Sequence, residues 1–370
     1  MGQDVFLAGQ HSLRLTRAAR RDPGLLLVPA PDEHLRTGQT AIDLPSLRSS
    51  LPDILLPIAP GAPLEMTFFS REARSESALV RSRCLLSRLP SASFLEVVHA
   101  DGNPWDYAGE GALRLFVESP ALSLIRMCQQ LDALVSRSAL SPNAAFFRLL
   151  TFPMEACGSY ARDPSDPAFG SCAFELPALC RADDLSAFLG EATGIRGLRQ
   201  ARRVATLVQD GAGSPEETLL SFAFKLPPEL GGIEAPPFSE NEPIEWPSDV
   251  LHLIEHRRMR PDFHWARHRT ASEYNGKEHV SEEAFEEDQR RVRDYQTCGI
   301  SVFPASYKNV STLSALNAYL ARVAHALAQT EGAEFEARVR RTLADEGASF
   351  MRRVLLSQML PAVPSEKPDW

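Results

Sequence analysis

Cysteine is scarce in this sequence and is not arranged for metal binding. The six cysteines among the 370 residues form no CxxC pair and no zinc-type spacing. Free thiols of this kind are typical of a reducing compartment. The sequence also lacks a GxSxG segment, a Walker loop and a GxGxxG segment. We therefore expect neither a serine-hydrolase elbow nor nucleotide-driven chemistry.

Long apolar runs and an excess of basic charge are also missing. No window approaches the roughly 18 apolar residues that a membrane span needs, and the opening segment MGQDVFLAGQ has no signal-peptide pattern. We therefore expect a soluble, cytoplasmic protein with no membrane partner. The formal net charge of −9 argues against a protein that coats nucleic acid by bulk charge. A nucleic-acid function has to rest on a local site.

The composition is that of a globular protein with more than one domain. Hydrophobic residues make up 44% of the chain and charged residues 24%. Short apolar runs separated by Pro, Gly and Ser predict a strand-rich α+β region over residues 1–115. Apolar residues at helical spacing predict a helical middle region over 116–210 and a helical appendix over 309–370. The remaining region, residues 211–308, carries the residues suited to chemistry.

Several helix boundaries can be predicted from short-range signals. Ser119 is placed to cap a helix that starts at Pro120. Ser214, Pro215 and Glu217 form a capping-box pattern at the start of another helix. The expected helices of the middle region span 119–136, 143–158, a segment starting near Asp184, and 195–210. Those of the appendix span 313–327 and 332–358.

The helix expected over 195–210 carries a basic face. Arg196, Arg199 and Arg203 lie at steps of three and four residues, which places them on one side of a helix. Such a face can hold phosphates, so these arginines are candidate nucleic-acid contacts. The alternative is a solvated face whose charges pair with acids.

Residues 258–304 contain the strongest candidate site. Their pattern predicts a strand, a turn, a strand, a helix over about 282–297 and a final strand. Asp262 opens the first strand and Glu273 lies in the second. Two strands joined by a tight turn can bring these carboxylates side by side. Converging carboxylate oxygens are what a hard divalent cation requires.

The segments RPDFHW, ASEYNGKEH and FEEDQRRVRDYQTCGISVFP resemble the Vsr-like branch of the PD-(D/E)XK nuclease superfamily. This resemblance implies a C-terminal α/β domain of the restriction-endonuclease-like type, with a central mixed sheet flanked by helices. It also implies that Asp262 and Glu273 bind Mg²⁺ or Mn²⁺. The helix that contains Asp288, Arg290 and Arg291 matches the family's acidic-basic helix.

Other residues match the family pattern less closely. His279 corresponds to the family's active-site histidine, and Glu217 corresponds to an accessory acid at the start of the domain. Asn275 stands where the family has Asp, so it removes a negative charge and a potential base. Lys277 could supply a lysine from a shifted position. Upstream segments, including FVESPALSLIRM and GIRGLRQARRVATLVQDGAGSPEETLL, resemble AbiEi-type proteins of phage-defence and toxin–antitoxin systems.

Each of these residues also has a structural interpretation. Glu217 could be only the acid of a capping box, and His279 only a surface or helix-capping residue. Arg290 and Arg291 are candidate phosphate contacts, but they follow an acidic run that is typical of a solvated helix N-terminus.

Two functions are consistent with the sequence. The first is a Mg²⁺-dependent endonuclease that hydrolyses DNA phosphodiesters in phage defence or DNA repair, with Asp262, Glu273, Glu217, Asn275, Lys277 and His279 at its centre. The second is a catalytically inactive nuclease-fold regulator or antitoxin, which binds DNA and a toxin or defence-system protein. Asn275 and the acidic net charge favour the second. A third hypothesis is an interaction scaffold built on the helical C-terminus.

Overall fold

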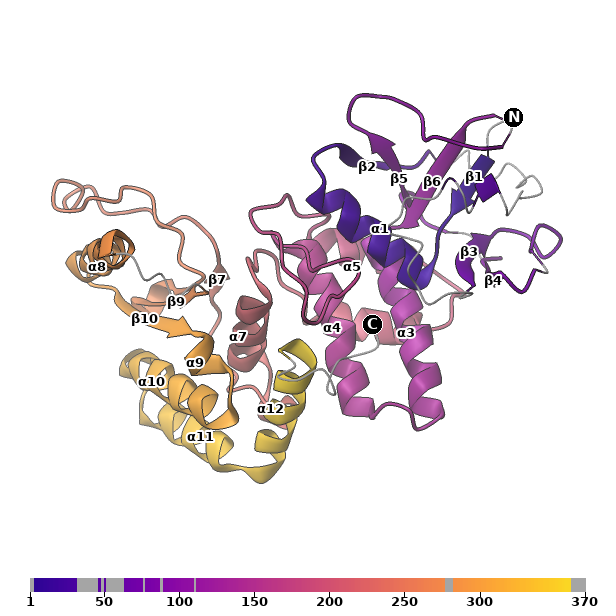
Figure 1. The fold of residues 1–370 in the computed structure, drawn as a ribbon. Coiled ribbons are helices and arrows are strands. Elements are labelled where there is room, and N and C mark those ends of the chain that lie inside the picture. The colour runs from indigo at the N-terminus through magenta and orange to yellow at the C-terminus, as the bar shows by residue number, and fades with distance from the viewer. Residues whose placement is uncertain are drawn as a thin grey trace. The chain divides into compact units, whose positions relative to one another are not determined.

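Two units make up the chain, and they divide between Gln209 and Asp210. The four-region division predicted from the sequence has a boundary one residue away from this point, and its finer boundaries stay predictions. The computed structural model (Figure 1) describes residues 3–31, 46–47, 50, 63–75, 77–86, 89–109, 111–276 and 282–360, with only the backbone of 282–285. Lys277, His279 and the C-terminal ten residues lie outside this description.

The first unit begins with a four-stranded sheet in the order β1-β6-β5-β2, in which β1 and β6 are parallel and the other neighbours antiparallel. A separate parallel pair joins β3 and β4. The expected strand-rich character of this region is therefore confirmed. The strands are β1 Gln3–Phe6, β2 Leu25–Pro29, β3 Leu64–Phe68, β4 Val80–Cys84, β5 Phe94–His99 and β6 Leu113–Glu118.

Helix α1, Gly9–Arg21, was not predicted from the sequence. Its buried side includes polar residues such as Ser12, Thr16 and Arg17. The sequence therefore has no apolar stripe that would predict this helix. Ser12 and Arg17 have partners distant in sequence, whereas the Thr16 hydroxyl has no hydrogen-bond partner among the described residues. Arg17, for example, forms a buried ion pair with Glu155, at 2.8 Å.

The predicted helices of the middle region are present. Ser119 and Ser141 cap α3 and α4 as their Ser-Pro pairs indicate. The last predicted helix is shorter than expected, because Gly197 adopts φ +89° and the helix starts after it. Arg196 is therefore outside the helix. The helices are α3 Pro120–Ser136, α4 Pro142–Cys157, α5 Ala182–Glu191 and α6 Leu198–Ala205.

The second unit is a mixed α/β assembly around a sheet in the order β10-β9-β8-β7. β7, β8 and β9 are antiparallel neighbours, whereas β10 returns parallel to β9 after α8. This confirms the predicted series of strand, turn, strand, helix and strand. The elements are α7 Pro215–Lys225, β7 Ser239–Glu240, β8 Phe263–Trp265, β9 Thr270–Asn275, α8 Glu282–Thr297 and β10 Ser301–Ser306.

Helices cover the sheet of the second unit. Helices α8 and α10 both pack against it and lie on opposite sides of it in Figure 1. The predicted single helix over 332–358 is wrong, since an extended backbone at Asp345 divides it. The Asp345 carboxylate accepts a hydrogen bond from the Ala348 amide at 2.7 Å and so caps the following helix. The helices are α9 Tyr307–Val310, α10 Leu313–Glu331, α11 Ala333–Ala344 and α12 Glu346–Met359.

Among the described helices, none combines the length and the apolar content that crossing a membrane requires.

Candidate active site

Asp262 immediately precedes β8, and Glu273 lies on the neighbouring strand β9. The antiparallel pairing of β8 with β9 joins Phe263 to Ser272. If this register is continued by one residue beyond the end of β8, Asp262 falls opposite Glu273, and the charge of Glu273 does act on Asp262. Opposed residues of an antiparallel pair direct their side chains to the same face. The turn between the strands therefore brings together two of the residues singled out in the sequence.

Hydrogen bonds orient both carboxylates and use one oxygen of each. The Tyr274 amide donates to Asp262 Oδ2. Arg291 Nη2, at 2.8 Å, and the Tyr295 hydroxyl donate to Glu273 Oε1. Within the described residues, these donors leave Asp262 Oδ1 and Glu273 Oε2 without a hydrogen bond.

Glu217 is a third carboxylate close to this pair, and it is buried whereas the other two are partly buried. Its amide donates to the Ser214 hydroxyl at 3.1 Å, as the capping-box pattern predicts. Its side chain does not complete the box, however, because Oε2 accepts from the Gly213 amide at 2.7 Å and from Asn241 Nδ2 at 2.8 Å. The side chain is therefore held at the beginning of α7, and it acts electrostatically on Asp262.

The carboxylates of this cluster are electrostatically disfavoured in their charged forms. Burial, followed by the charges of Glu217 and Glu273, raises the pKa of Asp262 well above its usual value. Burial also raises the pKa of Glu217, although its hydrogen bonds oppose this shift. Like charges in a poorly solvated site repel one another, so a cation placed among them would be strongly favoured.

Glu240 belongs to the same region and was missed in the sequence. It lies on β7 and is 4% exposed. One of its oxygens accepts from the Ser221 hydroxyl at 2.5 Å, while Oε2 has no hydrogen-bond partner among the described residues. Burial, together with the nearby charge of Glu217, raises its pKa to about 8. No local signal could have found it, because its two-residue strand lies in a Pro-rich connector that predicts a loop.

Aromatic packing fixes α7 against the sheet that carries these acids. The Phe224 ring contacts the rings of Phe263 and Trp265 edge-on, with centroids 5.2 and 4.9 Å apart. Trp265 is fully buried, and its indole N–H donates to the Pro236 carbonyl at 3.0 Å. Trp265 is therefore a core residue that sets the position of α7, and with it that of Glu217.

The remaining predicted residues fall into three groups. Asn275 ends β9 and is exposed. Lys277 and His279 lie outside the described residues. Arg291 holds Glu273, and Arg290 pairs with Glu287 at 2.5 Å, so in this structure both guanidinium groups contact carboxylates.

The basic residues predicted on one helical face belong to the first unit. Arg196, Arg199 and Arg203 are all exposed. Only Arg199 and Arg203 lie on α6, because the helix begins at Leu198. The expectation of one continuous three-arginine helical face is therefore wrong.

The donor set suits a hard divalent cation held by two protein carboxylates. In the part of the chain that the structure describes, no three His, Cys, Asp or Glu side chains are arranged to hold a metal ion. Mg²⁺, however, is usually bound by one or two carboxylates together with waters and substrate phosphates. Asp262 Oδ1 and Glu273 Oε2 would meet that requirement.

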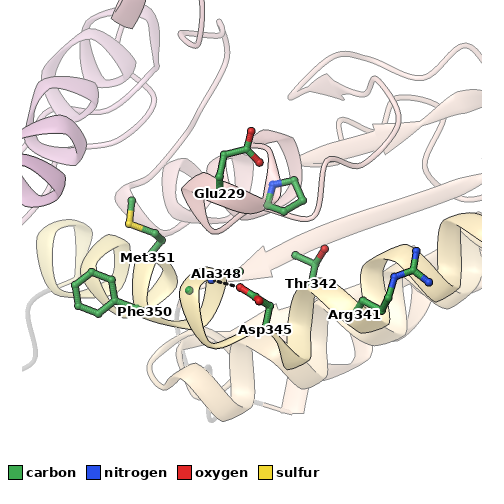
Figure 2. A pocket seen from close by; sticks show the side chains of 9 residues that line it. Glu229, Arg341, Thr342, Asp345, Ala348, Phe350 and Met351 are labelled. Atoms are coloured by element: carbon green, nitrogen blue, oxygen red, sulfur yellow. Dashed lines mark hydrogen bonds between the residues drawn. The ribbon is translucent and has the colours of Figure 1, made fainter.

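A separate hollow in the second unit lacks this chemistry. Its volume is about 670 Å³, and it lies where α11 meets α12 (Figure 2). Its acid Asp345 is already used as a helix cap, and the exposed Phe350 ring lies at its rim. We therefore locate the candidate active site at the carboxylate cluster.

No protein-family model, curated protein or solved structure matches the chain. The functional interpretation therefore rests on the residues and geometry described above.

Proposed function

We propose that the second unit is a metal-dependent DNA endonuclease of the PD-(D/E)XK type, similar to its Vsr-like branch. The observation that carries the proposal is that Asp262, immediately before β8, lies close to Glu273 on the neighbouring strand β9, with one oxygen of each left for a cation. The series α7-β7-β8-β9-α8-β10 supports it, because it supplies the mixed sheet flanked by helices that this family resemblance implies.

In this proposal the protein's own groups position the reaction. Asp262 and Glu273 would bind Mg²⁺ or Mn²⁺, which supplies a Lewis acid and lowers the pKa of a bound water. Arg291 and Tyr295 fix the orientation of Glu273, and the Tyr274 amide fixes that of Asp262. In metal sites generally, hydrogen-bond partners of this kind hold the ligating side chains in the orientation that binds the metal.

Glu217 and Asn275 would have supporting roles. Glu217 adds negative charge next to Asp262, and this charge would favour the binding of a cation. Asn275, exposed at the end of β9, offers a neutral amide oxygen where the resembled family has a carboxylate. It accepts a hydrogen bond but cannot take a proton as a base.

The proposal predicts cleavage of DNA that depends on a divalent cation. Supercoiled plasmid incubated with the full chain and Mg²⁺ or Mn²⁺ is expected to be nicked or linearised, and EDTA is expected to stop the reaction. Gel electrophoresis of the plasmid forms provides the measurement. Cleavage that continues in EDTA would show that the reaction does not need a metal. A plasmid that stays intact with both metals would contradict the proposed nuclease activity.

The second candidate is a catalytically inactive DNA-binding regulator or antitoxin. The neutral Asn275 and the net charge of −9 favour it. It predicts DNA binding that is insensitive to EDTA, with an affinity that falls steeply as salt increases, or capture of a toxin-like partner protein. An intact plasmid together with such binding would replace the first proposal with this one.

A further inference from the structure

An arginine-rich cavity lies in the first unit, away from the carboxylate cluster in sequence and in chemistry. Its volume is about 300 Å³, and four arginines and one glutamate are among its lining residues. Arg81 and Arg83 lie on β4, Arg137 follows the C-terminus of α3, and Arg148 lies on α4. Such a concentration of positive charge is notable in a chain with a net charge of −9.

Glu65 is the glutamate of this cavity, and it offsets only part of the positive charge. Its carboxylate is buried, at 4% exposed. Oε1 accepts from Arg81 at 3.0 Å and from Arg83 at 3.4 Å, and Oε2 accepts from the Gln10 amide at 3.0 Å. Arg137 donates through Nε to the Ala133 carbonyl, which carries no charge. Arg81, Arg83 and Arg137 are thus matched by a single carboxylate.

The arginines of β4 keep donors for a ligand. Each uses one terminal nitrogen on Glu65, and within the described residues their other N–H groups make no hydrogen bond. The guanidinium group presents its donors in a planar fork that suits the oxygens of phosphate. A phosphate monoester carries about −1.5 to −2 charges near neutral pH. This charge matches the surplus of Arg81, Arg83 and Arg137 over Glu65 better than a single carboxylate would.

Apolar side chains also line the cavity, together with three glutamines, Gln10, Gln129 and Gln130. Leu13 comes from α1, and Met127, Leu131 and Leu134 come from α3. Apolar side chains add affinity only for a ligand that has an apolar or aromatic part. A ligand with such a part and a phosphate therefore fits the cavity better than an inorganic ion does. The volume is at the lower end of that of small-molecule sites. One nucleotide combines a phosphate and an aromatic base at about this size.

We propose that this cavity binds a single nucleotide, with its phosphate on Arg81, Arg83 and Arg137 and its base against the apolar side chains of α3. The nucleotide is either a free mononucleotide or the phosphorylated 5′ end of a nucleic-acid strand. Both sources present the same phosphate monoester, and the experiment distinguishes them.

The test is calorimetric titration of the full chain with AMP and, separately, with a 5′-phosphorylated single-stranded oligonucleotide. Arg83→Ala and Arg137→Gln are each expected to lower the affinity for the probe that binds about tenfold or more, because each removes charge-assisted hydrogen bonds. Arg137 is exposed at a helix end, so Arg137→Gln keeps the test valid if Arg83→Ala does not fold. Leu134→Trp is expected to fill the cavity and so to lower the affinity for the same probe. The affinity for inorganic phosphate, measured alongside, is expected to stay unchanged.

Arg71→Ala is the matched control, because Arg71 is exposed in the same unit and does not line the cavity. Tight AMP binding supports a free nucleotide as ligand. Binding of the phosphorylated strand without AMP supports a strand end. The proposal is overturned if neither probe binds, or if Arg71→Ala weakens binding as much as Arg137→Gln does.

Discussion

Asp262→Asn is expected to lower the rate of metal-dependent DNA cleavage on the order of a thousandfold. Asn has nearly the same shape as Asp but removes a charged oxygen that the cation needs. The bound ion contributes several kcal/mol of charge stabilisation in the transition state, and about 1.4 kcal/mol corresponds to a factor of ten in rate. Initial rates of plasmid nicking give the measurement, with the exposed Glu334→Gln on α11 as the control. A variant that cleaves at the wild-type rate would refute this site.

The same substitution is expected to stabilise the metal-free protein at neutral pH. The pKa of Asp262 is raised in the folded state, mainly by burial, so the folded protein binds a proton more readily than the unfolded chain does. Its contribution to stability is complete below the unfolded pKa, about 3.9, and is lost as the pH rises through the folded pKa. At pH 8 in EDTA, urea unfolding of Asp262→Asn should give a higher free energy of unfolding than wild type, and this difference should shrink toward pH 4. A less stable variant at pH 8 would contradict the electrostatic account.

Arg17→Met is expected to lower the free energy of unfolding by about 3–5 kcal/mol, as removal of one partner from a buried ion pair typically does. Arg17 is 2% exposed, and it donates to both oxygens of Glu155 at distances from 2.8 to 3.2 Å. Burial alone would raise the pKa of the Glu155 carboxyl, but Arg17, with help from Arg162 and Arg20, holds it below its usual value. Chemical denaturation monitored by circular dichroism measures the loss.

A double variant separates the ion pair from simple packing. Arg17→Met with Glu155→Gln removes both charges, so it should recover much of the stability lost in Arg17→Met. A double variant as unstable as the single one would show that the loss comes from packing around α1 and not from an unpaired carboxylate.

Elements that depend on neighbouring residues could be predicted from the sequence. Ser119-Pro120 and Ser214-Pro215 correctly marked the starts of α3 and α7, because capping is decided within four residues. The strands around Asp262 and Glu273 were found for a similar reason, since a short connection fixes which residues of the two strands face each other.

Elements that depend on distant partners could not be predicted. Helix α1 buries Arg17, which only the presence of Glu155 on α4 makes acceptable. Glu240 lies on a strand whose existence depends on pairing with β8. The hydrogen bond from Arg291 to Glu273, 18 residues earlier, likewise exists only in the fold, and the phosphate contact expected for Arg291 stays a prediction. In each case the feature depends on a tertiary contact, which local sequence patterns do not predict.

Titration of Mn²⁺ into the metal-free full chain, followed by calorimetry, tests the metal centre most directly. The account predicts saturable binding to wild type that is lost in the Asp262→Asn/Glu273→Gln double variant and kept in Glu334→Gln. Wild type that binds no Mn²⁺, or a double variant that binds it as wild type does, would contradict the assignment of Asp262 and Glu273 as metal ligands.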